Sequence, residues 1–153
     1  MRICVLGGGS WGTALGLHSA RLGHDVCIWE YDPELAKAHQ AARENTRYLP
    51  DVRFPDNLEM RGDLQGALAE AELVLLVVPS QTMRSTLTAA AEWIPKQAIL
   101  CVASKGVEQN SLMTMDEVIG DVLGAQMQER IAVLSGPSFA LELAHGKTTA
   151  VVI

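Results

Sequence analysis

Residues 3–15 read ICVLGGGSWGTAL, an apolar run that leads directly into a glycine-rich turn. Gly7, Gly9 and Gly12 have the G-x-G-x-x-G spacing that binds dinucleotides when a strand precedes it and a helix follows it. In such a loop the first glycine permits a tight turn, the second lets the backbone approach a pyrophosphate, and the third lets the helix pack closely on the strand. Because a strand-sized apolar run precedes the loop and a helical pattern follows over Trp11–Leu22, the context of the motif is complete.

The second expected strand gives a further indication of dinucleotide binding. Asp25–Trp29 is followed by Glu30, 18 residues after Gly12. This is close to the roughly 20 residues that separate such a loop from the acid that binds the adenosine ribose. One alternative is an ordinary strand, turn and helix with a solvated glutamate. A Walker A loop does not fit, because no Lys-Ser or Lys-Thr pair directly follows Gly12. We therefore favour a dinucleotide-binding domain.

Short apolar runs alternate with longer helical stretches along the chain. This alternation predicts an α/β fold of the Rossmann type, with a doubly wound, mostly parallel sheet. Tyr48–Asn57 holds two prolines and no clean period, so we expect a loop there. The expected strands are Ile3–Leu6, Asp25–Trp29, Leu58–Met60, Leu73–Val78, Ala98–Ala103, Ile131–Leu134 and Thr149–Ile153. The expected helices are Trp11–Leu22, Pro33–Arg43 with Asp32 as N-cap, Asp63–Ala71, Gln81–Trp93, Leu112–Leu123 and Ser138–His145.

The size and charge of the chain limit the classes of protein to which it can belong. Its 153 residues suit one domain, here a dinucleotide-binding domain over residues 1–153. The apolar last run leads us to expect the front part of a longer protein, cut at or near a domain boundary. The net charge of −6 disfavours nucleic acid as a partner. No apolar run is long enough to span a membrane and no signal-peptide pattern precedes the glycine loop, so we expect a cytoplasmic protein.

Cysteines and histidines offer no recognisable metal or catalytic site. Cys4, Cys27 and Cys101 lack metal-ligand spacing, and each lies in an apolar, strand-like run. We expect them to be reduced, buried packing residues. No nucleophile elbow is present. Four histidines have no obvious partner and are expected at surface or boundary positions: His18, His24, His39 and His145.

Three loops that follow expected strands carry the next candidates: Pro79-Ser80, Ser104-Lys105-Gly106 and Ser135-Gly136-Pro137-Ser138. Ligands of doubly wound sheets lie just outside the carboxyl ends of the strands, so these loops are expected to face the cofactor. Lys105 can bind a phosphate or polarise a carbonyl there, although a solvated loop lysine fits its position equally well. Ser138 either caps the following helix or belongs to a turn whose free N–H groups bind a polar ligand.

Several short motifs along the chain match those of a known family and occur in the same order. They are Gly7-x-Gly9-Ser10-Trp11-Gly12-Thr13-Ala14-Leu15, Asn45-x-x-Tyr48-Leu49-Pro50, Val78-Pro79-Ser80, Lys105-Gly106 and Ser135-Gly136-Pro137-Ser138-Phe139-Ala140 with Glu142. Together they resemble the bacterial-type NAD(P)-dependent glycerol-3-phosphate dehydrogenases, and the resemblance spans the whole chain. The Ser-Trp-Gly-Thr-Ala and Ser-Gly-Pro-Ser-Phe-Ala strings are quite specific, whereas the glycine pattern alone is not.

The resemblance implies an oxidoreductase that interconverts dihydroxyacetone phosphate and sn-glycerol 3-phosphate with NAD(P)H and feeds glycerophospholipid synthesis. The general acid/base lysine of the family belongs to the following helical domain, so no catalytic residue is expected in this chain. A homodimer is compatible with the full-length form. The resemblance also implies that the dinucleotide is contacted by Ser10, Trp11, Tyr31, Lys105 and Ala140, and the substrate by Lys105, Gly136 and Ser138.

The residues after the second strand bear on the choice of cofactor. Relatives often have a basic or small residue here, whereas this chain has Glu30-Tyr31-Asp32. Since a carboxylate accepts hydrogen bonds from ribose hydroxyls and repels the 2′-phosphate of NADP, we expect NAD to be favoured. Two rival functions remain: another Rossmann dehydrogenase of the hydroxyacid or 6-phosphogluconate type, and a non-catalytic nucleotide-sensing module. Lys105 and the loop over 135–140 argue against the sensing module, which needs no substrate loop.

Overall fold

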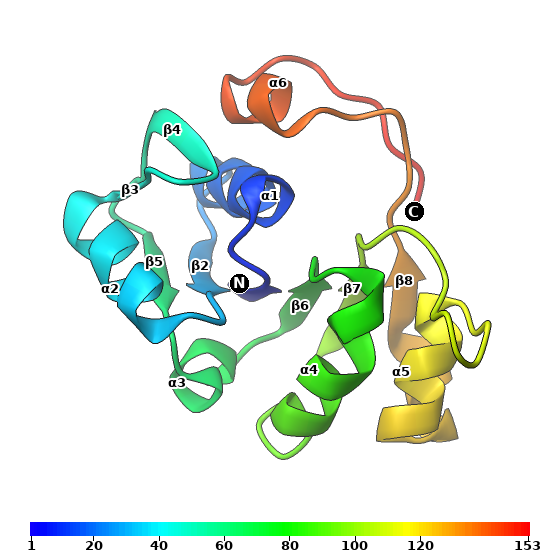
Figure 1. Ribbon diagram of the computed structural model, residues 1–153. Helices are drawn as coiled ribbons and strands as arrows, with labels where there is room; N and C mark the ends of the chain where they lie inside the picture. Colours follow the sequence, from blue (N-terminus) through cyan, green and yellow to red (C-terminus); the bar gives the residue numbers. More distant parts are fainter.

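The computed structural model describes residues 1–153 and contains a six-stranded parallel sheet in the order β5-β2-β1-β6-β7-β8 (Figure 1). From β1 the chain builds outward through β2 to β5 at one edge, and then returns to β6 on the other side of β1. The Rossmann-type, doubly wound α/β fold is thus confirmed. The strands of this sheet are β1 (Arg2–Leu6), β2 (Asp25–Trp29), β5 (Leu58–Arg61), β6 (Leu73–Leu76), β7 (Ile99–Val102) and β8 (Ile131–Val133).

Helices cover both faces of the sheet. On one face lie α1 (Ser10–Arg21), α2 (Pro33–Ala42) and α6 (Ala140–Ala144), and on the other lie α3 (Leu64–Leu68), α4 (Met83–Ala90) and α5 (Met115–Leu123) (Figure 1). Residues of β1 alternate between the two cores: Cys4 and Leu6 join the cluster of α3, α4 and α5, whereas Ile3 and Val5 join the cluster of α1. Because both faces are covered, the central strands are apolar throughout.

Two helix ends follow the sequence signals closely. Asp32 is the N-cap of α2, and its carboxylate accepts hydrogen bonds from the backbone N–H groups of Glu34 (3.0 Å) and Leu35 (3.3 Å). Pro33 occupies the first turn of α2, where its missing N–H costs nothing. After α1, Gly23 has a φ of 87°, a left-handed conformation that ends the helix as expected.

The segment expected to be a loop forms a small antiparallel hairpin instead, so that expectation is wrong. β3 (Glu44–Asn45) pairs with β4 (Leu49–Arg53). Leu49 and Val52 of β4 are buried in the α1-side core. Pro50 is exposed, and a two-stranded ribbon has free edges on which a residue without an N–H breaks no ladder. The two buried apolar side chains therefore outweigh the prolines as the determinant of structure here.

Elements in the C-terminal third differ from expectation. Thr149–Ile153 forms no strand of the sheet, because only Val152 makes a bridge, to Ser135. The N-cap of α6 is Phe139 in an extended conformation, so Ser138 does not cap this helix. Of the two interpretations of Ser138, helix capping is therefore wrong.

Smaller differences concern helix bounds and one histidine. The expected helix Gln81–Trp93 is a short 3₁₀ turn, η1 (Ser80–Thr82), followed by α4. α5 begins at Met115, because Thr114 and Glu117 form a capping box that fixes its start. His39 is fully buried rather than at the surface, because α2 packs this side chain inward. The expectation of free, buried cysteines is confirmed.

Candidate functional site

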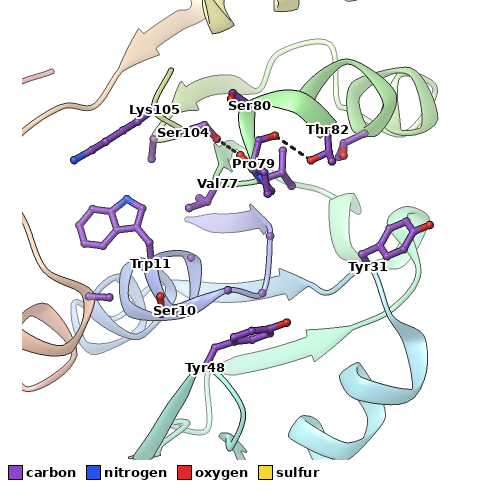
Figure 2. A pocket seen from close by; sticks show the side chains of 18 of the residues that line it. Ser10, Trp11, Tyr31, Tyr48, Val77, Pro79, Ser80, Thr82, Ser104 and Lys105 are labelled. Carbon is purple, nitrogen blue, oxygen red and sulfur yellow. Dashed lines mark hydrogen bonds between the residues drawn. The ribbon is translucent and has the colours of Figure 1, made fainter. Parts of the chain in front are cut away.

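A cleft of about 910 Å³ opens where the sheet changes direction between β1 and β6, at the carboxyl ends of the strands. Ligands of doubly wound sheets bind at this position. The cleft is lined by the loops after β1, β2, β6 and β7, by the hairpin, and by the segment that leads into α6. Figure 2 shows Trp11 below Ser104 and Lys105 at one end of the cleft and Tyr31 at the opposite end.

The glycine loop lies along one side of this cleft, with Gly7, Gly9 and Gly12 all among the lining residues. Gly7 has a φ of 125°, which residues with side chains rarely adopt. At Gly9 nothing lies within 4 Å of the place that a Cβ atom would take, so a ligand can approach the backbone closely. No side chain caps the N-terminus of α1, which starts at Ser10. The first N–H groups of a 12-residue helix are therefore left for a phosphate.

Glu30 lies beside the glycine loop, at the end of β2. It is only 8% exposed, lines the cleft, and its carboxylate packs against Gly8. One carboxylate oxygen accepts a hydrogen bond from the backbone N–H of Asp32 at 3.2 Å. The structure thus places an acid where the sequence pattern expects the ribose-binding group. Tyr31 is 83% exposed, and its ring meets the edge of Trp29 at the rim of the cleft.

The opposite wall follows β6 and β7. The hydroxyl of Ser104 shares its one proton between the backbone carbonyl oxygens of Val78 (2.5 Å) and Leu76 (3.1 Å), which joins the end of β7 to the end of β6. Lys105 follows directly, is exposed, and points its ammonium group toward the carbonyl oxygen of Gly136 at 3.4 Å. The ammonium group therefore stands free at the cleft mouth, apart from this one long contact, and remains available to an anionic ligand.

The loop that follows Lys105 is clamped to α4 and to the turn before it. The side chain of Gln81 donates to the carbonyl of Val107 at 2.8 Å and accepts from the N–H of Gln109 at 3.0 Å. Arg84 forms a forked ion pair with Glu108, and the hydrogen bond lowers the pKa of that carboxyl below its ordinary value. These contacts hold the loop against α4.

The residues expected on the substrate side are only partly gathered in the cleft. Ser138 and Ala140 line it, together with Phe139, which is 70% exposed. Gly136 does not line the cleft, although its carbonyl oxygen accepts a hydrogen bond from Lys105, which does. The remaining residues expected to contact the cofactor are all in the lining: Gly7, Gly9, Ser10, Trp11, Gly12, Glu30, Tyr31 and Lys105.

Sequence reasoning missed the polar side of the β6 wall. Ser80 lines the cleft, as its loop was expected to, but so do Thr82, Ser85 and Thr86 of η1 and α4. Nothing marks them in the sequence, since hydroxyl residues are common at helix starts. Only the strand order, which brings β6 next to β1, reveals their place. Tyr48 also lines the cleft. The sequence indicated it only through the Asn45-x-x-Tyr48-Leu49-Pro50 motif.

No group of three or more His, Cys, Asp or Glu side chains lies close enough together to hold a metal ion. None of the helices combines the length and the apolar character that crossing a bilayer requires.

Comparison with known proteins gives a consistent result. A sequence model described as the NAD-dependent glycerol-3-phosphate dehydrogenase N-terminus matches residues 2–153. The glycerol-3-phosphate dehydrogenase (NAD(P)+) of Chlorobium luteolum is 47% identical over 152 residues, which cover 99% of this chain and 46% of that protein. The corresponding protein of Thioalkalivibrio sulfidiphilus is 45% identical over 151 residues, covering 99% of this chain and 45% of that protein.

A solved structure agrees with these sequence matches. The crystal structure of glycerol-3-phosphate dehydrogenase from Coxiella burnetii superposes with a TM-score of 0.89 at 37% identity. It covers 98% of this chain and 45% of that chain. The chain thus spans a little less than half the length of the curated relatives that it matches.

Proposed function

Because the chain belongs to the family of NAD-dependent glycerol-3-phosphate dehydrogenases, whose N-terminal part it matches, we propose that it forms the cofactor-binding half of an oxidoreductase. The proposed reaction interconverts dihydroxyacetone phosphate and sn-glycerol 3-phosphate with NAD or NADP, for glycerophospholipid synthesis. We place the enzyme in the cytoplasm. A homodimeric full-length form stays a prediction, which analytical ultracentrifugation would test.

One observation supports this proposal above the others: the glycine loop, an acid and a free lysine all line the same cleft at the switch point of the sheet. The residues present fit a dinucleotide. Gly9 and the uncapped start of α1 suit its pyrophosphate, and Glu30 suits the adenosine ribose. When bound, the nicotinamide supplies or takes the hydride of the reaction.

The substrate-side residues of this chain have binding and orienting roles in the proposal. The Lys105 ammonium group attracts the phosphate or the carbonyl oxygen of the substrate. Its attraction to the carbonyl oxygen strengthens as negative charge develops on that oxygen during the reaction. Ser138, at the same end of the cleft, offers a hydroxyl. No group here is assigned as the general acid/base. On its own, the 153-residue chain should therefore bind the dinucleotide but convert dihydroxyacetone phosphate only very slowly.

A chimera tests the function directly. Residues 1–153 replace the matching N-terminal part of the Chlorobium luteolum enzyme, and oxidation of NADH is followed with dihydroxyacetone phosphate as substrate. We expect turnover at an ordinary enzymic rate, on the order of 1–1,000 per second. The isolated chain serves as the low-activity control. A folded chimera that binds NADH but leaves it unoxidised would instead favour the nucleotide-sensing module.

A further inference from the structure

Asn45, in the β3–β4 hairpin, is joined to the glycine loop. It is completely buried in β3, and its side-chain amide nitrogen donates hydrogen bonds to the carbonyl oxygen of Gly8 (2.8 Å) and the hydroxyl of Thr13 (2.7 Å). Its side-chain oxygen accepts a hydrogen bond from the backbone N–H of Tyr48 at 3.0 Å. Both donors of the amide are thus used on the loop and on the first turns of α1.

The Gly8 carbonyl determines which way the next peptide N–H points. Across a trans peptide the C=O and the N–H point in opposite directions. Since the Gly8 carbonyl is turned inward to Asn45, the N–H of Gly9 is turned outward, away from the hairpin. No backbone acceptor within the protein takes this N–H, and Gly9 lines the open cleft. The hydrogen bond from Asn45 therefore keeps the N–H of Gly9 pointing into the cleft, where it can donate to a ligand.

The same side chain reaches a second part of the cleft. Through its oxygen, Asn45 holds the backbone of Tyr48, whose ring lines the cleft on the side opposite Pro79 and Thr82 (Figure 2). The side-chain amide of Asn45 thus connects the glycine loop to the part of the cleft that Tyr48 lines. Thr13 adds a longer hydrogen bond of 3.4 Å to the same Gly8 carbonyl.

We propose that Asn45 is a positioning residue that holds the Gly8–Gly9 peptide in the orientation that binds the pyrophosphate of the dinucleotide. The inference rests on the proposed function, since it requires a pyrophosphate ligand in the cleft. A merely structural role would be to satisfy buried polar groups, and would affect stability alone. A positioning role affects the affinity for every ligand that carries the pyrophosphate, whatever stands at its nicotinamide end.

Asn57 provides a matched control. Its side-chain amide nitrogen also donates to two acceptors, the carbonyl oxygens of Ala20 (2.7 Å) and His24 (2.8 Å). The first lies in the last turn of α1 and the second in the turn that follows this helix, at the end remote from the cleft. Asn57→Ala therefore removes a similar pair of hydrogen bonds from the C-terminal end of α1 and the turn after it, without touching the glycine loop.

The test compares Asn45→Ala, Asn45→Asp and Asn57→Ala with the unaltered chain by thermal melting and by titration with NADH and ADP-ribose. We expect Asn45→Ala to weaken both ligands by a similar factor of about tenfold or more, the equivalent of one or more lost hydrogen bonds. Asn45→Asp, which turns a carboxylate toward the Gly8 carbonyl, should weaken them further. Asn57→Ala should lower the melting temperature and leave both affinities within about twofold. Unchanged affinities in Asn45→Ala overturn the inference and leave the proposed function standing, whereas a wild-type chain that binds neither ligand overturns both.

A second measurement needs no variant and covers the case in which the Asn45 substitutions do not fold. In ¹⁵N NMR spectra of the unaltered chain, ADP-ribose should shift the backbone amide of Gly9 strongly. The side-chain amide protons of Asn45 should remain protected from exchange with and without ligand. A Gly9 amide that stays in place at saturation, or Asn45 amide protons that exchange freely, would overturn the assignment.

Discussion

Gly12 packs so closely against Gly7 that a Cβ atom on Gly12 would overlap the Gly7 carbonyl oxygen. Because that oxygen belongs to the backbone, it cannot move aside as a flexible side chain would. Gly12→Ala should therefore destabilise the fold by about 1–3 kcal/mol or more, as overpacked core substitutions do. Urea unfolding followed by circular dichroism measures this loss directly.

Gly9→Ala should behave in the opposite way. Gly9 has a φ of −69°, which any residue adopts, and its surroundings are open. The variant should melt at the wild-type temperature, yet its methyl group would occupy the space through which a pyrophosphate approaches. For the wild type, ligand at a hundredfold excess over its dissociation constant adds about 2.7 kcal/mol of stability. If NADH stabilises Gly9→Ala as much as wild type, the pyrophosphate binds elsewhere.

Lys105→Met should weaken catalysis far more than stability. The ammonium group makes one long contact, to Gly136, so its loss should leave the melting temperature nearly unchanged. In the chimera with the Chlorobium luteolum enzyme, loss of a charge-assisted contact should lower kcat/KM by about 10- to 150-fold, equivalent to about 1.5–3 kcal/mol. Lys96→Met, at a position outside the cleft, is the control. Kinetics that match the unsubstituted chimera would make Lys105 a bystander.

The three cysteines should be inert in the folded chain. Cys4 and Cys27 lie side by side on β1 and β2 with no exposed surface, and Cys101 is 5% exposed. Burial raises the pKa of the Cys27 thiol to about 12 and that of Cys4 well above its ordinary value. Since the thiolate is the reactive form, Ellman's reagent at pH 8 should label no thiol in minutes and all three in denaturant. Rapid labelling of the native chain would contradict this burial.

Much of the fold is predictable from the sequence because its signals are local. The strand of apolar residues before Gly7, the N-cap at Asp32 and the helix-ending Gly23 each act within a few residues. The β3–β4 hairpin escapes such reasoning, because its stability comes from the burial of Leu49 and Val52 against α1, a contact between segments distant in sequence. His39 is buried for the same reason.

The residues of the candidate site also fall into those that local sequence signals predict and those that depend on contacts between distant segments. Gly7, Gly9, Gly12, Glu30 and Lys105 follow strand ends, and the rule that such loops face the ligand places them correctly in the cleft. Asn45 and the hydroxyl residues of α4 could not be found in this way, since their roles depend on which strands become neighbours. The expected cap at Ser138 was wrong because Phe139 is extended and delays the start of α6.

His39 predicts how stability depends on pH. Its ring lies in α2 with Nδ1 3.5 Å from the Thr46 hydroxyl, and Nε2 has no partner. Burial lowers the pKa of the imidazole, against the attraction of Glu30 and together with the repulsion of Arg47. Between the lowered folded value and the unfolded value of about 6.5 the unfolded chain binds more protons, so acidification in this window destabilises the fold.

The expected slope is at most about 1.4 kcal/mol per pH unit for this one proton. Urea unfolding at pH 7.5 and pH 5.5 should show the loss in the wild type and a smaller one in His39→Leu. His18→Gln, which alters an exposed histidine of α1, should keep the wild-type difference. A His39→Leu chain with an undiminished pH dependence would assign the effect to other groups.

The choice between NAD and NADP depends on the charges near Glu30. Lys37, the first basic residue that follows, pairs with Glu34 at 2.7 Å, and the next two, Arg43 and Arg47, are also engaged. The Arg43 guanidinium donates to the carbonyl oxygen of Pro55 at 2.5 Å, on the side of β5. Arg47 lies over the ring of Tyr48, 5.1 Å from its centre, and does not line the cleft. Neither arginine lines the cleft in which a phosphate beside Glu30 would lie.

We therefore predict tighter binding of NADH than of NADPH, by about tenfold or more, the effect expected of like charges brought together in a partly desolvated cleft. The carboxylate of Glu30 packs against Gly8 and accepts a hydrogen bond from the Asp32 N–H, which restrains its movement, and Asp32 adds a second negative charge nearby. Fluorescence titrations at fixed ionic strength measure both constants. Glu30→Ser should reduce the difference between the affinities for NADH and NADPH, because it relieves the repulsion of NADPH. Arg47→Ala should leave the ratio of the two affinities unchanged. Tighter NADPH binding by the wild type would reverse the assignment, and an unchanged ratio in Glu30→Ser would show that another group sets the preference.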